Sequence, residues 1–252
     1  MVQTRKFKTR DWVKHKKDGR IGSITNFSNR SYNVRFIGAG RAESVSARQL
    51  TKCRKAPQAL YLEGSLDKDL ASTRSGVAAL RTWLDSIEMD LAYKNIHCLE
   101  DIRILYPAFQ GGKRPVFVHI GCHGDFDKKK KSLFIQLDPK RKRIYLDEME
   151  TVDTFKKAFA GLPLLFSACE LGAHSDLMNK FCRQADLPTV AAYTVDADDY
   201  ECLLFELMLY QGVYVKGWKF TTAVTKAKAS LHVLGIGGRQ GKGQSFVKTF
   251  PA

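Results

Sequence analysis

The chain has 252 residues, of which 44% are apolar, and a formal net charge of +15. This length allows one large domain, or a main domain with a small one beside it, and the apolar share is enough for a sizeable core. No window holds the roughly 18 consecutive apolar residues that a membrane span needs. The first ten residues are basic but lack the apolar segment of a secretory signal, so we expect a cytoplasmic protein that does not enter a membrane.

The positive charge is concentrated near the N-terminus. Residues 1–58 contain 15 Lys and Arg against 3 Asp and Glu, whereas the remaining 194 residues contain 26 and 23. This asymmetry favours an acidic partner, either nucleic acid or an acidic protein surface. A solubilising basic surface explains the same composition, and the sequence leaves both interpretations open.

Residues 10–53 are predicted to form four or five short strands. Lys17-Asp18-Gly19-Arg20 is typical of a tight hairpin turn, because Asp-Gly tolerates the positive φ that such a turn requires. Tyr32 to Phe36 alternates apolar and polar residues, as a half-buried strand does. The pattern resembles small SH3-like or Tudor-like barrels, and we place such a barrel at residues 1–56.

From residue 57 to residue 252, strands are predicted to alternate with helices. The expected strands are residues 59–62, 95–99, 116–120, 162–168 and 189–195, with a hairpin at 132–137 and 143–146. The expected helices are residues 75–87, 149–159, 175–182, 198–210 and 220–231. This alternation favours right-handed crossovers and an α/β fold, with a mainly parallel sheet covered by helices on both faces.

Two reactive side chains stand where predicted strands end. Val116 to Ile120 leads into His123-Gly124, and Leu162 to Ala168 leads into Cys169, 46 residues after His123. If the two strands are parallel neighbours, His123 and Cys169 emerge at the same edge of the sheet, where open α/β sheets hold their ligands. A thiol beside an imidazole is a nucleophile with its base.

The other cysteines and histidines have plainer interpretations. The six cysteines are scattered singly, so we expect small buried side chains rather than disulfides. His119 lies within a strand and is expected to be a satisfied core residue. Cys122 would point away from His119 on that strand, which argues against a zinc site made of His119, Cys122 and His123. We expect neither a metal nor a cofactor.

Four segments together resemble the caspase-like cysteine peptidases, and within them the CHAT branch. They are the strand ending in His123-Gly124, the strand ending in Ser167-Ala168-Cys169-Glu170, the strand ending in Asp196, and the helices over residues 205–212 and 223–229. The match covers roughly residues 59 to 233 and implies a caspase-like domain at residues 57–252. Ser167 stands where the caspase motif Gln-Ala-Cys-x-Gly has glutamine, so cleavage after aspartate is not implied.

The resemblance also implies roles for individual residues. Cys169 would be the nucleophile, and His123 would protonate the leaving amine. The backbone N–H groups of Gly124 and Cys169 would form the oxyanion hole, where removing one donor costs about 3 kcal/mol of transition-state stabilisation. Gly124 suits this position because a Cβ there would crowd the substrate carbonyl.

Substrate preference is predicted from the acidic residues near this site. The resemblance places the pocket for the residue before the cut at residues 63–69, at Ser167 and at residues 194–199. The carboxylates in these segments are Asp67, Asp69, Asp196 and Asp198. An acidic pocket selects Arg or Lys through a charge-assisted pair, and Asp196 is the residue we favour for it. The structural alternative is that Asp198 and Asp199 complement a helix N-terminus.

The sequence therefore predicts a cysteine-type endopeptidase, a thiol protease that cuts a protein substrate. Compact CHAT proteases belong to bacterial antiviral defence and cell-death systems, so the resemblance implies an upstream activator, a protein or a nucleic-acid-containing complex, that engages the barrel. The alternative is a catalytically silent caspase-like scaffold whose basic barrel binds nucleic acid or an acidic protein. An acyltransferase or hydrolase with the same dyad and a small substrate also stays open.

Overall fold

The computed structural model describes residues 6–28, 31–37, 39–53, 59–65, 76–86, 89, 91–105, 115–196, 199–235 and 245–251. Its strands form three sheets, of five, three and six strands. No helix within these ranges has both the length and the apolar character needed to cross a bilayer.

The N-terminal sheet is antiparallel and has the strand order β4-β3-β2-β1-β5. Its strands are β1 (Trp12–His15), β2 (Ile21–Ser28), β3 (Ser31–Phe36), β4 (Ala42–Val45) and β5 (Leu50–Lys52), with a short 3-10 helix η1 (Ala47–Gln49) before the last. Side chains of β3 alternate between half-buried and buried, so one face of the sheet covers a small core. The turn after β1 contains Gly19 at φ +74, as the Asp-Gly pair predicts. The predicted boundary at residues 56 and 57 lies outside the described residues.

The six-stranded sheet has the order β14-β13-β12-β8-β6-β7. Five of its strands are parallel, and β14 pairs antiparallel with β13 at one edge. The strands are β6 (Ala59–Glu63), β7 (Leu91–Asn95), β8 (Val118–Gly121), β12 (Leu164–Ser167), β13 (Val190–Tyr193) and β14 (Val247–Phe250). The fold is therefore α/β with a mixed, mostly parallel sheet, as predicted. Parallel order matters here because it brings the carboxyl ends of neighbouring strands to one edge.

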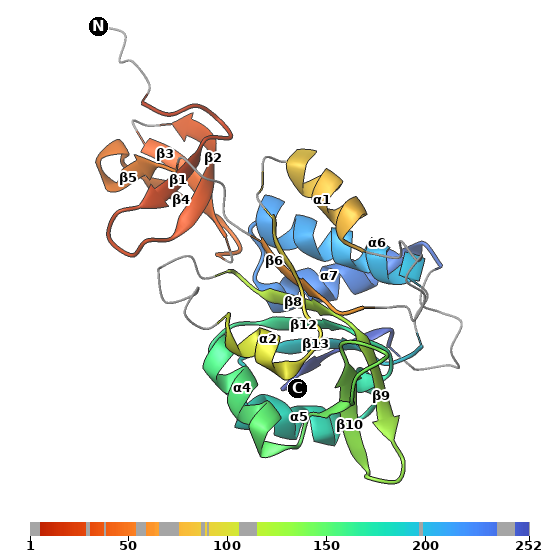
Figure 1. The fold of residues 1–252 in the computed structure, drawn as a ribbon. Helices are drawn as coiled ribbons and strands as arrows, with labels where there is room; N and C mark the ends of the chain where they lie inside the picture. Colours follow the sequence, from red (N-terminus) through yellow and green to blue (C-terminus); the bar gives the residue numbers. More distant parts are fainter. Residues whose placement is uncertain are drawn as a thin grey trace, which may run out of the picture.

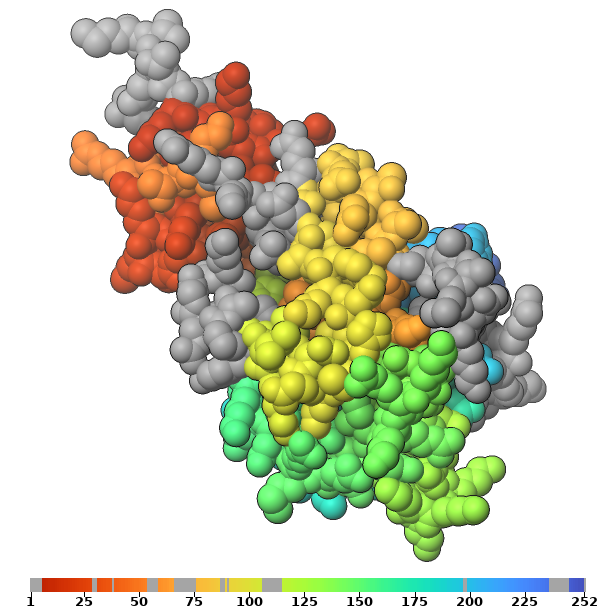
Figure 2. All heavy atoms as spheres, viewed as in Figure 1, coloured from red at the N-terminus to blue at the C-terminus, as the bar shows by residue number. Residues whose placement is uncertain are grey.

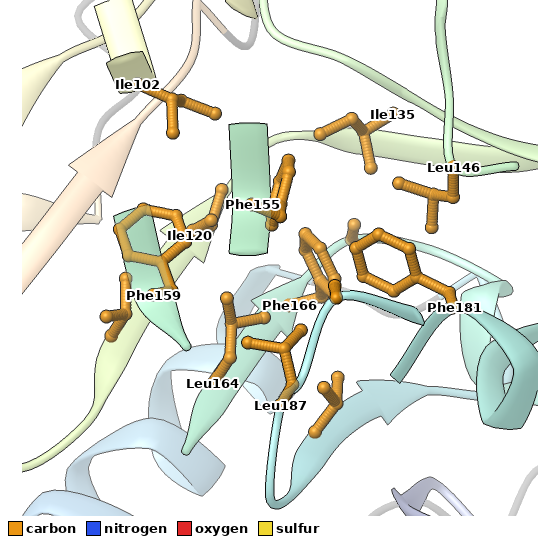
Figure 3. Close-up of a cluster of buried hydrophobic side chains, with 14 of the residues drawn as sticks. Ile102, Ile120, Ile135, Leu146, Phe155, Phe159, Leu164, Phe166, Phe181 and Leu187 are labelled. Atoms are coloured by element: carbon orange, nitrogen blue, oxygen red, sulfur yellow. The ribbon is translucent and has the colours of Figure 1, made fainter. Parts of the chain in front are cut away.

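Helices cover both faces of this sheet (Figure 1). One layer holds α1 (Val77–Ser86), α6 (Asp199–Tyr210) and α7 (Phe220–Val233), with the π-helical turn η3 (Gln211–Val215) between the last two. The other holds α2 (Leu99–Arg103), α4 (Met149–Phe159) and α5 (Ser175–Gln184). On this second side Phe155, Phe166 and Phe181 pack together, with the Phe155 and Phe181 rings 5.3 Å apart (Figure 3). Burying each such ring stabilises the fold by roughly 1.5–3 kcal/mol.

A small third sheet has the order β11-β10-β9 and extends beyond the carboxyl end of β8. Its strands are β9 (His123–Asp127), β10 (Ser132–Gln136) and β11 (Ile144–Tyr145). The hairpin of β10 and β11 was predicted, whereas β9 was not. The polar segment His123–Asp127 has little apolar pattern to reveal a strand, and His123 is consequently the first residue of a strand rather than part of a loop.

One other predicted segment needs correction. The strand expected at residues 95–99 is instead β7, which ends at Asn95. Leu99 begins α2, because the Asp101 carboxylate accepts the backbone N–H groups of His97 at 2.7 Å and Cys98 at 3.1 Å and so caps the helix. The sequence also gave no sign of β14.

Candidate active site

His123 and Cys169 reach the same edge of the central sheet through the pairing of β8 with β12. Gly121, at the end of β8, is in register with Ser167, at the end of β12. His123 lies two residues after Gly121, and Cys169 lies two residues after Ser167. The Cys122 N–H donates to the Ser167 carbonyl at 3.0 Å, which extends the pairing beyond the strands. The two side chains therefore leave adjacent parallel strands at the same height.

Both side chains line one cavity of about 340 Å³. Its wall comes from β6, from the carboxyl ends of β8, β12 and β13 with the residues that follow them, from Gly76 before α1, and from residues 199–206 of α6. Its lining residues are Tyr61, Gly76, Gly121, Cys122, His123, Ser167, Ala168, Cys169, Tyr193, Asp196, Asp199, Cys202, Leu203 and Glu206. A cavity of this size suits a side chain or a small ligand.

Gly124 lies against the segment that carries Cys169. A Cβ added to Gly124 would lie 2.9 Å from the Ala168 Cβ, 3.0 Å from the Leu171 Cγ and 3.1 Å from the Cys169 carbonyl oxygen. Glycine is thus required for close packing between β9 and the residues around Cys169, a reason beyond the predicted access of a substrate carbonyl.

The backbone turns sharply after Cys169. Glu170 has φ +58, a left-handed conformation that few residues other than glycine adopt, and the Leu171 N–H donates to the Cys169 carbonyl at 2.7 Å. The Glu170 N–H donates to the Val195 carbonyl at 3.1 Å and ties this turn to the end of β13. Burial raises the pKa of Glu170, and the nearby carboxylate of Asp125 raises it further. The thiol of Cys169 is therefore presented from a constrained turn rather than from an extended loop.

Asp196 follows β13 and contacts the thiol directly. The Cys169 Sγ donates to Asp196 Oδ1 at 3.2 Å. The sequence placed Asp196 beside the site, and the structure puts it in the cavity wall with Ser167. The other three carboxylates expected near the substrate pocket, Asp67, Asp69 and Asp198, lie outside the described residues.

Glu206, in the middle of α6, is a lining residue that the sequence analysis missed. It is 5% exposed, and its Oε1 accepts the Ser167 hydroxyl at 2.6 Å and the Tyr193 hydroxyl at 3.2 Å. One signal could have identified it. Residues 203–210 are apolar or aromatic except for Glu206, and a lone carboxylate in such a helix is either paired or functional.

His119 lies on β8 behind this cavity and is fully buried. Its ring stacks on Tyr61 at 4.2 Å between centroids, and its Nδ1 is 3.2 Å from the Tyr210 hydroxyl. Its Nε2 lies 3.4 Å from Glu206 Oε1 but makes no hydrogen bond with good geometry. His119 is thus a core and packing residue, as expected, and only its Nε2 lacks a hydrogen bond.

Two further cysteines line the cavity, Cys122, which is buried, and Cys202, which is half-buried like Cys169. Burial raises the pKa of Cys122, which is 4% exposed and belongs to the apolar core. Burial and the charge of Glu206 raise the pKa of Cys202. Cys169 is half-buried and opens onto the cavity. Within the described parts of the chain, no three His, Cys, Asp or Glu side chains gather as a metal site would require.

Comparison with protein-family models gives no match, and comparison with curated proteins gives no significant match either. A thiol, an imidazole and close-packed backbone at the carboxyl edge of a parallel sheet are the groups that acyl transfer through a thioester uses.

Proposed function

We propose that this protein is a cysteine endopeptidase of the caspase-like, CHAT type, with an SH3-like module at its N-terminus. One observation carries the proposal. His123 and Cys169 each lie two residues after a pair of residues in register on neighbouring parallel strands, and both side chains line one cavity. A buried structural cysteine has no need of a cavity, a neighbouring imidazole and a tightly turned backbone. Their combination favours a nucleophile.

The reaction follows from the roles of these groups. The thiol proton of Cys169 passes to the His123 imidazole as the sulfur attacks the carbonyl carbon of the scissile peptide, and the carbonyl oxygen becomes an oxyanion. The backbone N–H groups of Gly124 and Cys169 stabilise this oxyanion. His123 gives a proton to the departing amine, which leaves a thioester on Cys169. Water then attacks the thioester, releases the carboxylate product and returns the thiol.

Replacement of the two reactive side chains tests this mechanism. Cys169→Ala and His123→Ala should each abolish hydrolysis of fluorogenic peptides, because each removes a group that takes part in bond exchange. Both side chains are half-buried at the cavity, so the melting temperature should change little. Suitable controls are Cys98→Ala and His97→Ala, which make the same changes on the loop before α2 and should keep wild-type activity.

Wild-type turnover by either Cys169→Ala or His123→Ala would rule the mechanism out. Mass spectrometry of the wild-type protein with a thiol-reactive peptide probe supplies a second measurement. The label should be found on Cys169, and a label confined to other cysteines would count against the proposal.

The N-terminal sheet supports a second role, binding of an acidic partner. Each carboxylate within residues 1–58 already pairs with a basic side chain, since Asp11 contacts Lys52 at 3.1 Å, and Asp18 and Glu43 contact Arg20 at 2.8 and 2.6 Å. Exposed basic side chains in the same region outnumber these three carboxylates. They include Lys8, Lys14, Lys16, Lys17, Arg41 and Arg48. In this candidate function the sheet recruits nucleic acid or an acidic protein.

A further inference from the structure

The cavity beside Cys169 is acidic. Three carboxylates line it, those of Asp196, Asp199 and Glu206, and no lysine or arginine is found among the described lining residues. Asp196 also touches the thiol. The cavity therefore combines a negative potential with the group we propose as the nucleophile, which is the setting for a cationic ligand.

Glu206 is the carboxylate best placed to meet such a ligand. Its hydrogen bonds from Ser167 and Tyr193 both end on Oε1, and the described residues provide no hydrogen-bond donor for Oε2. Ser167 and Tyr193 therefore hold the carboxylate in place and leave one oxygen for a ligand. A carboxylate can accept a guanidinium or an ammonium group through that second oxygen.

The buried surroundings of Glu206 give an independent reason to expect a cation. No lysine or arginine among the described residues pairs with this 5% exposed carboxylate, and the nearest basic group is the His119 ring at 3.4 Å. The Nε2 of His119, behind the cavity, is fully buried and makes no hydrogen bond, so this histidine does not hold the carboxylate through one. Buried charges are normally paired, and a basic side chain entering the cavity would supply the missing partner.

The position of Glu206 relative to Cys169 fits the side chain of the residue before the cut. Ser167 precedes Cys169 by two residues, a span of about 6–7 Å in extended backbone, and its hydroxyl touches Glu206. A side chain must therefore be long to reach from a carbonyl at the sulfur to this carboxylate. Lysine and arginine combine a long apolar stem with a charged tip.

We propose that Glu206 selects a lysine or arginine side chain immediately before the scissile bond, with Ser167 and Tyr193 orienting its carboxylate. This inference rests on the proposed peptidase function and specifies its substrate class. Glu206, in α6, thereby takes the specificity role that the sequence assigned to Asp196.

The test is a comparison of Glu206→Gln with wild type on four fluorogenic peptides that have Arg, Lys, Leu or Asp before the cut. Glutamine keeps an oxygen for Ser167 and Tyr193 but removes the charge. We expect kcat/KM for the Arg and Lys peptides to fall about 30-fold and that for the Leu peptide to change little. Glu201→Gln makes the same change on the same helix outside the cavity lining, and it should keep the wild-type preference.

A second measurement uses the wild-type protein and does not depend on how the variant folds. Benzamidine carries a planar cation like the head group of arginine, and benzamide is its neutral counterpart. Benzamidine should slow alkylation of Cys169 by iodoacetamide, and benzamide at the same concentration should not. Equal protection by both compounds, or by neither, overturns the inference.

The remaining outcomes separate this inference from the proposed function. Hydrolysis that needs Cys169 but prefers the Leu or Asp peptide upholds the peptidase and overturns the role of Glu206. An Arg or Lys preference that survives Glu206→Gln does the same. If wild type cleaves none of the four peptides, the proposed function fails and the inference fails with it.

Discussion

At the scale of single residues, burial disfavours the thiolate form of two thiols at the cavity and of one in the core. Burial raises the pKa of Cys122 and of Cys202, and it raises that of Cys182, on the buried side of α5, to about 12. Thiolates rather than thiols react with alkylating reagents. Cys169 is half-buried, lines the same cavity as His123 and is distinguished by its position after β12.

Alkylation of the native protein should therefore follow a clear order. At pH 8, iodoacetamide should modify Cys169 well before Cys122, Cys182 and Cys202, because their raised pKa values keep these last three thiols almost entirely protonated. Peptide mapping by mass spectrometry over time measures the four rates. In urea the order should disappear, since unfolding exposes all four sites. Native labelling of Cys202 or Cys122 as fast as that of Cys169 would contradict this account.

At the scale of elements, the local sequence pattern was enough to predict helices and strands that are marked by their own apolar residues. The helix predicted at residues 149–159 is α4 with the same bounds, because Val152, Phe155 and Phe159 repeat at helical spacing on its buried face. The strands leading to His123 and Cys169 were predicted because continuous apolar runs mark buried parallel strands.

The elements that were missed depend on distant partners. The strand β14 is only four residues long and pairs with β13, more than fifty positions earlier, so nothing local identifies it. The strand β9 is stabilised by pairing with β10 rather than by an apolar face. Glu206 escaped notice for a related reason. The helix that carries it is apolar on most sides, so helical periodicity did not show which side faces a cavity.

Hydrogen bonds to Asp127 stabilise the hairpin of β9 and β10 in a way that depends on pH. Its carboxylate accepts the backbone N–H groups of Lys129 at 2.9 Å and Lys130 at 3.1 Å, and the Tyr145 hydroxyl at 2.8 Å. Hydrogen bonds from Lys130 and Tyr145 are the main reason that the pKa of Asp127 falls from 3.8 to about 2. A carboxylate whose pKa is lowered by folding stabilises the folded state only while it is ionised.

Asp127→Asn should consequently lower the melting temperature at neutral pH. Because the folded pKa lies below the ordinary value, the stabilisation is fully present above about pH 4 and is lost as the pH falls toward 2. The difference in melting temperature between wild type and the variant should shrink over that interval. Asp153→Asn, on the exposed side of α4, is the control. A difference that stays constant from pH 7 to pH 2 would refute the assignment.

At the scale of the whole molecule, the N-terminal sheet forms a lobe at one end of the main body (Figures 1 and 2). The excess charge of the chain belongs mostly to this lobe, since residues 1–58 carry 15 basic and 3 acidic residues. Composition alone located this charge, but it could not tell whether the carboxylates were already neutralised. Their pairing with Arg20 and Lys52 leaves the remaining basic residues to determine the potential of the lobe.

Nucleic-acid binding, if the lobe provides it, should depend steeply on salt. Lys16→Glu with Lys17→Glu reverses two exposed charges in the turn after β1, and it should weaken binding to a DNA duplex and reduce the slope of log K against log salt by about 2. Fluorescence anisotropy at several salt concentrations measures both effects. Lys128→Glu with Lys129→Glu reverses two exposed charges in the β9–β10 turn and should change binding less. Equal losses in the two double variants would show that the lobe is not the binding surface.

The contact between the lobe and the helical layer lies close to the helix that carries Glu206. The Gly40 N–H donates to the Gly217 carbonyl at 2.6 Å, and Gly217 follows η3, which continues directly from α6. A ligand on the lobe that binds better with this contact made than broken would therefore favour the arrangement of Gly217, and of the helix before it, in which the contact forms. If that arrangement also changes how the cavity binds its ligand, thermodynamic reciprocity requires a cavity ligand to change the affinity of the lobe by the same factor. Binding at the lobe and binding in the cavity would then be coupled.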